Sequence, residues 1–173
     1  LGKVSELVGA VGEQDCKGFC GIGHTRWATH GSPSERNAHP HTSCANDIAV
    51  VHNGIIENFA ELREELTERG HCFSSDTDTE VVAHLIEDAY DGDLLQAVQK
   101  ATSRLIGAYG LAVIAEEDPQ TIVVTRKASP IVLGAGSDGS YVASDIIALI
   151  DATRDVVILE DNQFAVMKPE GIR

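Results

Sequence analysis

HTRWATHG, at residues 24–31, is followed by NAHPH at 37–41 and by HNG at 52–54. Two short apolar runs, 19–25 and 47–53, enclose this polar region and predict strands, because both are bounded by turn residues. Long loops without regular structure are usually functional or disordered, and this loop is too patterned in Arg, Trp, His and Pro to be disordered. Its guanidinium, indole, hydroxyl, imidazole and amide groups indicate a binding site for a small amino acid.

Downstream, the sequence predicts three helices and then a series of strands. Helical spacing of apolar residues occurs in 58–69, from Thr77 onward, and in 94–105. Thr77 and Glu80 have the spacing of a capping box. Strands are expected at 109–116, 121–127, 131–134, 141–144, 155–160 and 163–168, with a turn at Asp118-Pro119. This order of elements indicates an α+β fold in which helices pack against sheets.

Composition limits the possible functions. The 173 residues are 43% hydrophobic, which suits one domain with one core. Asp and Glu number 27 against 13 Lys and Arg, and the net charge of −14 argues against a nucleic-acid partner or an anionic membrane. No segment approaches the ~20 apolar residues of a membrane span, and no leader is evident. Four cysteines without a Cys-x-x-Cys pair fit a reducing cytoplasm, so we expect a cytoplasmic protein.

Four motifs together carry a resemblance to a known family. HTRWATHG, HNGIIEN at 52–58, SSDTDTEV at 74–81 and GAYG at 107–110 resemble the glutaminase domain of the glutamine-dependent fructose-6-phosphate aminotransferases. The resemblance begins at Leu1 and is less distinctive beyond Ala115. Related glutaminases, such as amidophosphoribosyltransferases and asparagine synthetases, share an Asn-Gly after the second strand but lack HTRWATHG. For residues 1–173 the resemblance implies the four-layer α-β-β-α sandwich of the N-terminal-nucleophile hydrolases.

The family's nucleophile is a cysteine in an N-terminal Cys-Gly-Ile, whereas this chain begins at Leu1. The resemblance therefore implies an N-terminally truncated domain that lacks its first strand and its nucleophile, and we expect the fragment to be inactive. Cys20-Gly21-Ile22 spells the same tripeptide internally. An N-terminal nucleophile, however, uses its own α-amine, which titrates near ~8, as the general base. Cys20 is thus interpreted as a buried structural residue, as are Cys16, Cys44 and Cys72.

The resemblance also assigns residues that would bind glutamine. Arg26 would pair with the α-carboxylate through its planar guanidinium. Trp27, Thr29 and His30 would line the same pocket, although Trp27 is equally well interpreted as a packing aromatic. Asp78 would be the counter-charge of the α-ammonium, and it could also offset the dipole of the helix that follows.

The expected catalytic residues are Asn53 and Gly54. Under the resemblance, the Asn53 side-chain amide and the Gly54 main-chain N–H form the oxyanion hole. Losing one such donor typically costs ~3 kcal/mol of transition-state stabilisation. A simple turn is the alternative for an Asn-Gly pair after a strand.

For the parent protein, the resemblance implies a glutamine-dependent, isomerizing aminotransferase. Glutamine would be split to glutamate and ammonia through a γ-glutamyl thioester. The ammonia would pass to C-terminal sugar-isomerase domains, absent from this chain, which convert fructose-6-phosphate to glucosamine-6-phosphate. A homo-oligomer is expected, with no metal and no organic cofactor.

Two alternatives remain. The first is a module that binds glutamine or glutamate without catalysis, and the missing first strand would then leave one wall of the site open. The second is a zinc hydrolase whose ligands come from His24, His30, His39, His41 and His52. That set matches no metal-binding spacing such as His-Glu-x-x-His.

Overall fold

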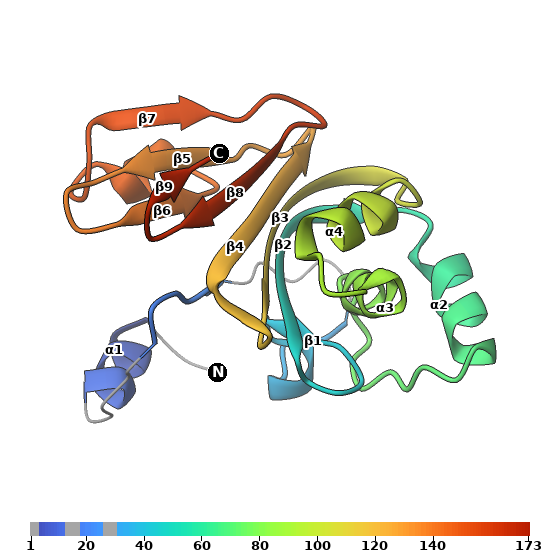
Figure 1. Ribbon diagram of the computed structural model, residues 1–173. Coiled ribbons are helices and arrows are strands. Elements are labelled where there is room, and N and C mark those ends of the chain that lie inside the picture. Colours follow the sequence, from blue (N-terminus) through green and yellow to red (C-terminus); the bar gives the residue numbers. More distant parts are fainter. Residues whose placement is uncertain (1–3, 13–17, 26–30) are drawn as a thin grey trace.

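The computed structural model describes residues 4–12, 18–25 and 31–173 (Figure 1). The helices are α1 (Val4–Gly12), α2 (Phe59–Glu68), α3 (Glu80–Ala89) and α4 (Leu94–Thr102), with short 3-10 helices η1 (Glu35–Asn37) and η2 (Ile146–Leu149). The strands are β1 (His41–Thr42), β2 (Ile48–Ile56), β3 (Gly107–Ala115), β4 (Asp118–Lys127), β5 (Val132–Ala135), β6 (Ser140–Ala143), β7 (Asp155–Ile158), β8 (Phe164–Lys168) and β9 (Gly171–Ile172).

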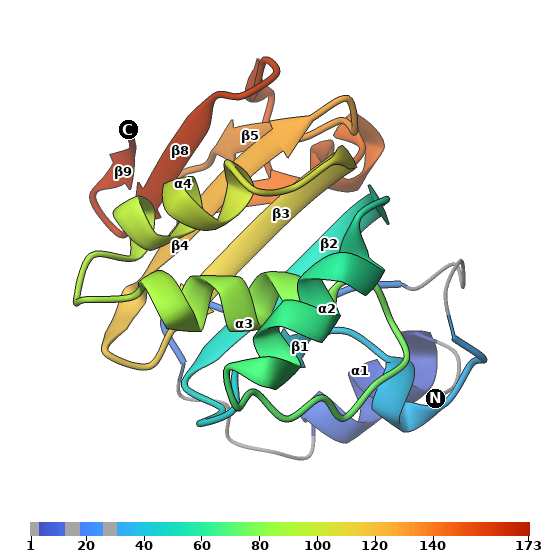
Figure 2. The ribbon, with the colours of Figure 1, turned by 90° about the vertical axis from the view of Figure 1, so that its right-hand side faces the viewer.

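The strands form two antiparallel sheets. The larger sheet has the order β1-β2-β3-β4-β8-β9, and the smaller has the order β6-β5-β7. The longest pairing of the larger sheet joins β2 to β3, from Ile48 opposite Ala115 to Ile56 opposite Gly107. Helices α3 and α4 cross one face of the larger sheet, as Figure 2 shows. The smaller sheet lies on the opposite side (Figure 1).

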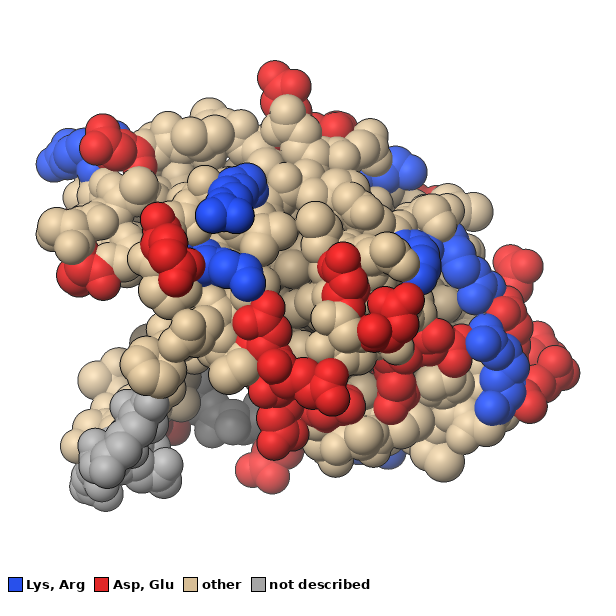
Figure 3. Space-filling view, viewed as in Figure 1, with Lys and Arg blue, Asp and Glu red and all other residues tan. Residues whose placement is uncertain are grey.

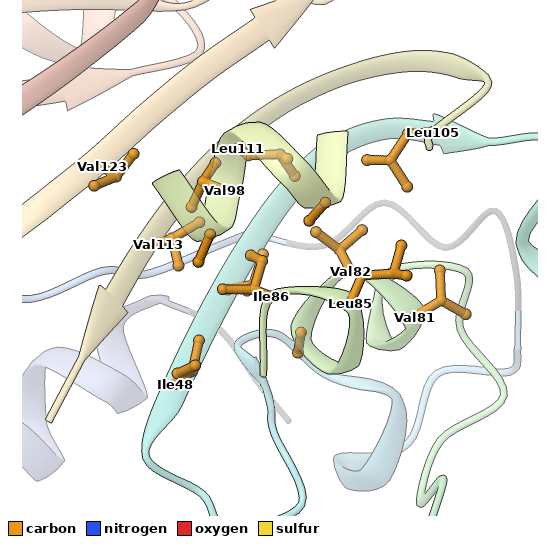
Figure 4. Packing of buried hydrophobic residues seen from close by; sticks show 14 of the residues in the cluster. Ile48, Val81, Val82, Leu85, Ile86, Val98, Leu105, Leu111, Val113 and Val123 are labelled. Atoms are coloured by element: carbon orange, nitrogen blue, oxygen red, sulfur yellow. The ribbon is translucent and has the colours of Figure 1, made fainter. Parts of the chain in front are cut away.

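Two hydrophobic cores separate these layers. The first lies between the helices and the larger sheet, where Val82 and Ile86 of α3 meet Leu111 and Val113 of β3 (Figure 4). This helix supplies a continuous buried stripe because its apolar residues recur at helical spacing. The second core lies between the two sheets and includes the side chains of Val124, Leu133, Ala165 and Met167.

A fourth layer is represented by η2. Leu133 of β5 faces the second core, so its neighbour Gly134 faces the opposite side of the smaller sheet. A Cβ at Gly134 would lie 2.7 Å from Thr153 Cγ2 and 3.3 Å from Leu149 Cδ1. Helix, sheet, sheet and η2 thus follow one another, and the expected α+β sandwich is confirmed.

Most predicted elements are present with small shifts at their ends, but some expectations are wrong. Residues 19–25 are extended without forming a strand of either sheet. Glycines at 18, 21 and 23 explain this, because glycine in a strand costs more chain entropy and packs no side chain. The turn expected around Asp118-Pro119 lies two residues earlier, at 116–117, because β4 already begins at Asp118. Helix α1 and the two-residue strands β1 and β9 were not predicted.

The capping box at Thr77 is not formed. Helix α3 begins only at Glu80, with Thr79 as its N-cap. Glu80 instead accepts hydrogen bonds from the main-chain N–H groups of Ser74 and Ser75, at 2.7 and 2.8 Å. Asp93, the residue before α4, caps that helix by accepting a hydrogen bond from the Gln96 main-chain N–H at 3.0 Å.

The acidic excess lies on the surface. On the face shown in Figure 3, acidic side chains gather near the centre and basic side chains are more thinly scattered. Within the described residues, no helix is both long enough and apolar enough to cross a membrane.

Candidate active site

The Asn53-Gly54 pair lies inside the ladder of β2, opposite Gly110 and Tyr109 of β3. Gly54 has a φ of 142°, which L side chains rarely adopt, and a Cβ there would lie 2.0 Å from the Ala108 carbonyl oxygen. Only glycine fits this backbone position. The interpretation of Asn53-Gly54 as a simple turn is therefore wrong.

A cavity of about 590 Å³ adjoins this part of β2. It brings together Asn53, Gly54 and Asp78, three of the residues predicted for the glutamine site. Its remaining walls come from α1, from the start of the HTRWATHG motif and the residue before it, from β2, from β6 and the residue after it, and from residues 39, 77 and 79. These lining residues are Val4, Leu7, Gly23, His24, Thr25, His39, His52, Ile55, Thr77, Thr79, Val142, Ala143 and Ser144. Arg26, Trp27, Thr29 and His30 lie outside the described residues, so their roles stay predictions.

Asp78 is held rigidly beside Gly54. Its side chain is buried, with 3% of the residue exposed, and Oδ2 accepts a hydrogen bond from the Ile56 main-chain N–H at 2.8 Å. It also lies two residues before the first residue of α3, where a carboxylate offsets the positive end of the helix dipole. The geometry therefore suits both expected roles of Asp78, a counter-charge in the cavity and a partner of the helix.

A hydrogen-bond network beneath the cavity fixes the loop that carries Asp78. His41 Nε2 lies 3.0 Å from Thr77 Oγ1, which in turn lies 3.0 Å from Ser75 Oγ. Ser75 Oγ donates to the Glu80 carboxylate at 2.7 Å. Burial raises the pKa of Glu80, but His84 and the groups of Ser75 and Ser74 outweigh burial and hold that pKa well below its usual range. Glu80 is thus a buried carboxylate that orders the loop.

His52, which the sequence analysis considers only as a possible zinc ligand, lines the cavity and belongs to the candidate site. Its Nδ1 lies 2.9 Å from Thr79 Oγ1, and that hydroxyl also lies 3.1 Å from His39 Nε2. The hydroxyl has one proton, so it can donate to one imidazole while accepting from the other. Nε2 of His52 is buried without a hydrogen-bond partner in the described part of the chain. The position of His52 directly before Asn53-Gly54 is the sequence feature that could have indicated a place in this site.

Burial lowers the pKa of His52 to about 4, and the nearby Asp78 carboxylate opposes this shift without cancelling it. His52 is therefore neutral at pH 7. The unfolded chain, with a His52 pKa near 6.5, binds more protons than the folded chain between pH 6.5 and 4. Stability is fully present above pH 6.5 and is lost as the pH falls.

We expect this loss to reach about 3 kcal/mol by pH 4. Urea unfolding at a series of pH values from 7 to 4 measures this loss. The free energy of unfolding should fall more steeply with falling pH for the unsubstituted chain than for His52→Asn. The variant keeps a polar atom near Thr79 and removes the titration. Parallel stability curves for the two proteins would show that His52 is not the group responsible.

The histidines proposed as alternative metal ligands are arranged otherwise. The His24 and His39 rings stack at 4.2 Å between centroids, and His39 meets His41 edge to face at 4.8 Å. Among the residues the structure describes, His24, His39, His41 and His52 do not belong to the group of side chains whose ligand atoms converge. His30 lies outside the described residues.

Cys20 does not line the cavity. Its Sγ donates to the Pro119 carbonyl at 3.0 Å, and burial, with a smaller effect of Asp118, raises the pKa of the thiol. A raised pKa leaves less of the reactive thiolate. The geometry therefore supports a structural interpretation of Cys20.

Comparison with known proteins places this site in a family. The family described as "Glutamine amidotransferase domain" matches residues 24–151, which is more than half of the chain. The glutamine–fructose-6-phosphate aminotransferase (isomerizing) of Thermotoga maritima is 57% identical over 153 residues, covering 88% of this chain and 25% of that protein. Its counterpart in Symbiobacterium thermophilum is 53% identical over 171 residues, covering 99% and 28%. The chain thus spans about a quarter of the length of these relatives.

A solved structure agrees with the sequence matches. The glutamine phosphoribosylpyrophosphate amidotransferase of B. subtilis, complexed with ADP and GMP, superposes with a TM-score of 0.73. It is 28% identical, and the alignment covers 87% of this chain and 33% of that one. The match to residues 24–151 contains Asn53, Gly54, Asp78 and His52. The chain belongs to the glutamine amidotransferase domain family.

Proposed function

We propose that this domain hydrolyses the side-chain amide of glutamine in the cavity beside β2. The observation that carries the proposal is the position of Gly54, whose φ of 142° and contact with the Ala108 carbonyl leave no room for a side chain at the cavity wall. A main-chain N–H at the wall of a cavity, next to a side-chain amide, is suited to stabilise a developing oxyanion. The family match supports the choice of reaction.

Each remaining polar group of the substrate has a proposed partner. The Asn53 side-chain amide and the Gly54 N–H would donate to the oxygen that becomes negative when the amide carbon is attacked. Asp78 would balance the α-ammonium, and its burial strengthens that electrostatic interaction. Arg26, with Trp27, Thr29 and His30, would close the site around the α-carboxylate.

The attacking thiol is proposed to come from a cysteine outside residues 1–173. Cys20, Cys44 and Cys72 do not line the cavity. The N-terminal α-amine of that cysteine would first take the thiol proton. Thiolate attack would form a carbon–sulfur bond and break the carbon–nitrogen bond of the amide, and the leaving nitrogen would take that proton back from the α-ammonium and depart as ammonia. Water would then cleave the thioester and release glutamate. The α-amine of an N-terminal cysteine is the proposed general base.

The relatives support a wider role, because their name joins glutamine to fructose-6-phosphate. The released ammonia is proposed to reach sugar-isomerase domains of a longer, homo-oligomeric, cytoplasmic protein that makes glucosamine-6-phosphate. That these relatives are about four times as long as this chain supports the presence of such domains.

Ammonia release from glutamine tests the proposal. We compare the 173-residue chain with an extended version that carries, before Leu1, the N-terminal segment of the family, which begins Cys-Gly-Ile. Release is expected only from the extended protein, and a Cys→Ser change at its first residue should abolish it. Glutamine binding without release by the extended protein would favour the module that binds without catalysis. Equal release from both chains would place the nucleophile within residues 1–173 and contradict the proposal.

A further inference from the structure

Four side chains outside the candidate active site converge on one point. The ligating atoms of Cys44, His71, His84 and Glu87 all lie within 4.8 Å of one another. None of these residues lines the cavity beside β2. They are the one such group among the described residues, and the proposed hydrolysis does not use them.

The four residues come from three separate segments. Cys44 lies in the turn between β1 and β2, and His71 follows the end of α2. His84 and Glu87 are three residues apart on α3, so they project from the same side of that helix. Figure 2 shows the turn, the end of α2 and helix α3 as neighbours. The cluster is therefore created by the fold and not by a local sequence motif.

Five of the separations between ligand atoms in the cluster suit a tetrahedral arrangement. Cys44 Sγ lies 3.6 Å from His71 Nδ1 and 3.5 Å from His84 Nδ1. The two Nδ1 atoms are 3.3 Å apart. Glu87 Oε2 lies 3.1 Å from Nδ1 of His71 and 3.3 Å from Nδ1 of His84.

A zinc ion with ordinary bond lengths reproduces these values. Zn–S, Zn–N and Zn–O bonds in tetrahedral geometry place sulfur and nitrogen about 3.5 Å apart, and nitrogen about 3.3 Å from a second nitrogen or an oxygen. Each of the five separations given above agrees with this expectation within about 0.2 Å. That difference is no larger than the tolerance used for metal–ligand bond lengths at a candidate site.

Hydrogen bonds alone account poorly for the cluster. A ring nitrogen has either one proton or one lone pair, so it forms one hydrogen bond in the ring plane. Here each Nδ1 faces three polar atoms at 3.1 to 3.6 Å. A metal ion at the common centre would bond to all four ligand atoms at once. Pairwise hydrogen bonds would account for only one of the three close contacts of each Nδ1.

Groups around the cluster resemble the outer shell of a metal site. The other ring nitrogen of His71, Nε2, lies 3.1 Å from Asp88 Oδ1, which fixes the ring with Nδ1 toward the cluster. The second carboxylate oxygen of Glu87, Oε1, accepts a hydrogen bond from the Ala45 main chain at 3.2 Å. Carboxylates that hold ligating imidazoles in this way are typical of metal sites.

We propose that Cys44, His71, His84 and Glu87 form a structural site for a divalent metal ion of the zinc class. One thiolate, two imidazoles and one carboxylate suit zinc in softness and geometry. On binding, the Cys44 thiol loses its proton to solvent, and the thiolate and carboxylate together neutralise the ion. All four tetrahedral positions come from protein, so the site is closed to substrate and its role is to hold the fold together.

The position of the site suggests what it stabilises. The metal would join the β1–β2 turn, the segment after α2, and α3, whose first residue, Glu80, lies two residues after Asp78. Cys44 is exposed, which leaves an entry path for the ion, whereas His84 is only 1% exposed. This proposal departs from the sequence expectation of no metal and of a purely structural Cys44, and it does not depend on the proposed hydrolysis.

Metal analysis and cobalt substitution of the whole protein test the site. The test variant is Cys44→Ser, which lies in an exposed turn and should leave the core intact. The matched control is Cys20→Ser, a cysteine outside the cluster. The parent and Cys20→Ser should each hold one more equivalent of zinc per chain than Cys44→Ser. Their cobalt forms should show thiolate charge-transfer and tetrahedral ligand-field bands that Cys44→Ser lacks.

Affinity and stability give independent readouts. Removing the Cys44 ligand should weaken zinc binding by more than about 100-fold, since even outer partners typically cost 10 to 100-fold. Chelation with EDTA should lower the Tm of the parent and of Cys20→Ser but leave Cys44→Ser unchanged. Zinc content, cobalt spectra and chelator sensitivity that are the same in all three proteins would overturn the proposal. So would the absence of bound zinc from the parent after incubation with the metal.

Discussion

Replacing Gly54 with alanine is expected to destabilise the folded domain by more than about 3 kcal/mol, enough to lose the native state in a marginally stable chain. The backbone φ of 142° is strained for any L side chain, and the added Cβ would lie 2.0 Å from the Ala108 carbonyl oxygen. Because this oxygen belongs to β3, the overlap can be relieved only by separating β2 from β3 beside the site. Urea unfolding at pH 7 measures the effect.

Gly70→Ala is the matched control for this change. Gly70 also has a positive φ, of 98°, but a Cβ there would meet no atom within 4 Å. Its cost should be limited to backbone strain, about 1 to 2 kcal/mol. A Gly54→Ala protein as stable as Gly70→Ala would mean that the close approach of β2 to β3 is not as the structure has it.

The regular elements could be predicted because their signals are local. Helices α2 and α4 are amphipathic over about three turns, and Asp93 caps α4 through a main-chain bond only three residues away. Strands β2 to β4 are apolar runs bounded by turn residues. Residues 19–25 were predicted as a strand because of their apolar residues. A strand also needs a second strand to pair with, and the local sequence does not specify one.

The candidate site was only partly predictable. Asn53, Gly54 and Asp78 lie in motifs whose family resemblance gave them roles, and the cavity brings these three together. The contribution of β6 was missed, because Val142, Ala143 and Ser144 reach the cavity only through the packing of the second sheet against the first. The sequence suggested His52 only as a metal ligand, because a histidine in a buried strand position gives no sign of which side chains its ring nitrogens meet.

The cluster of Cys44, His71, His84 and Glu87 could not be found from spacing. Known metal motifs place two ligands within a few residues in each of two segments. Here only His84 and Glu87 are close in sequence, and Cys44 lies 40 residues before His84. Metal-binding potential was therefore sought among the conspicuous histidines near HTRWATHG, where the described side chains are instead held by ring stacking and threonine hydroxyls.

The second large effect is expected for Asn53→Ala in the extended protein. Asn53 lies on the exposed side of β2, where its amide lines the cavity without supporting the core. Losing this oxyanion donor should reduce kcat for ammonia release by about 10²- to 10³-fold. KM should stay nearly constant, because the lost hydrogen bond is strongest in the transition state. Asp78→Asn is the matched contrast, since removal of the counter-charge should raise KM.

The kinetics of ammonia release from glutamine by the extended protein and its Asn53→Ala variant therefore test the central claim most directly. We expect rapid release by the extended protein and a kcat lower by about two to three orders of magnitude in the variant, with matching circular dichroism spectra and nearly equal KM values. A variant whose kcat lies within twofold of the parent would contradict it, because the cavity beside β2 would then not stabilise the reacting amide.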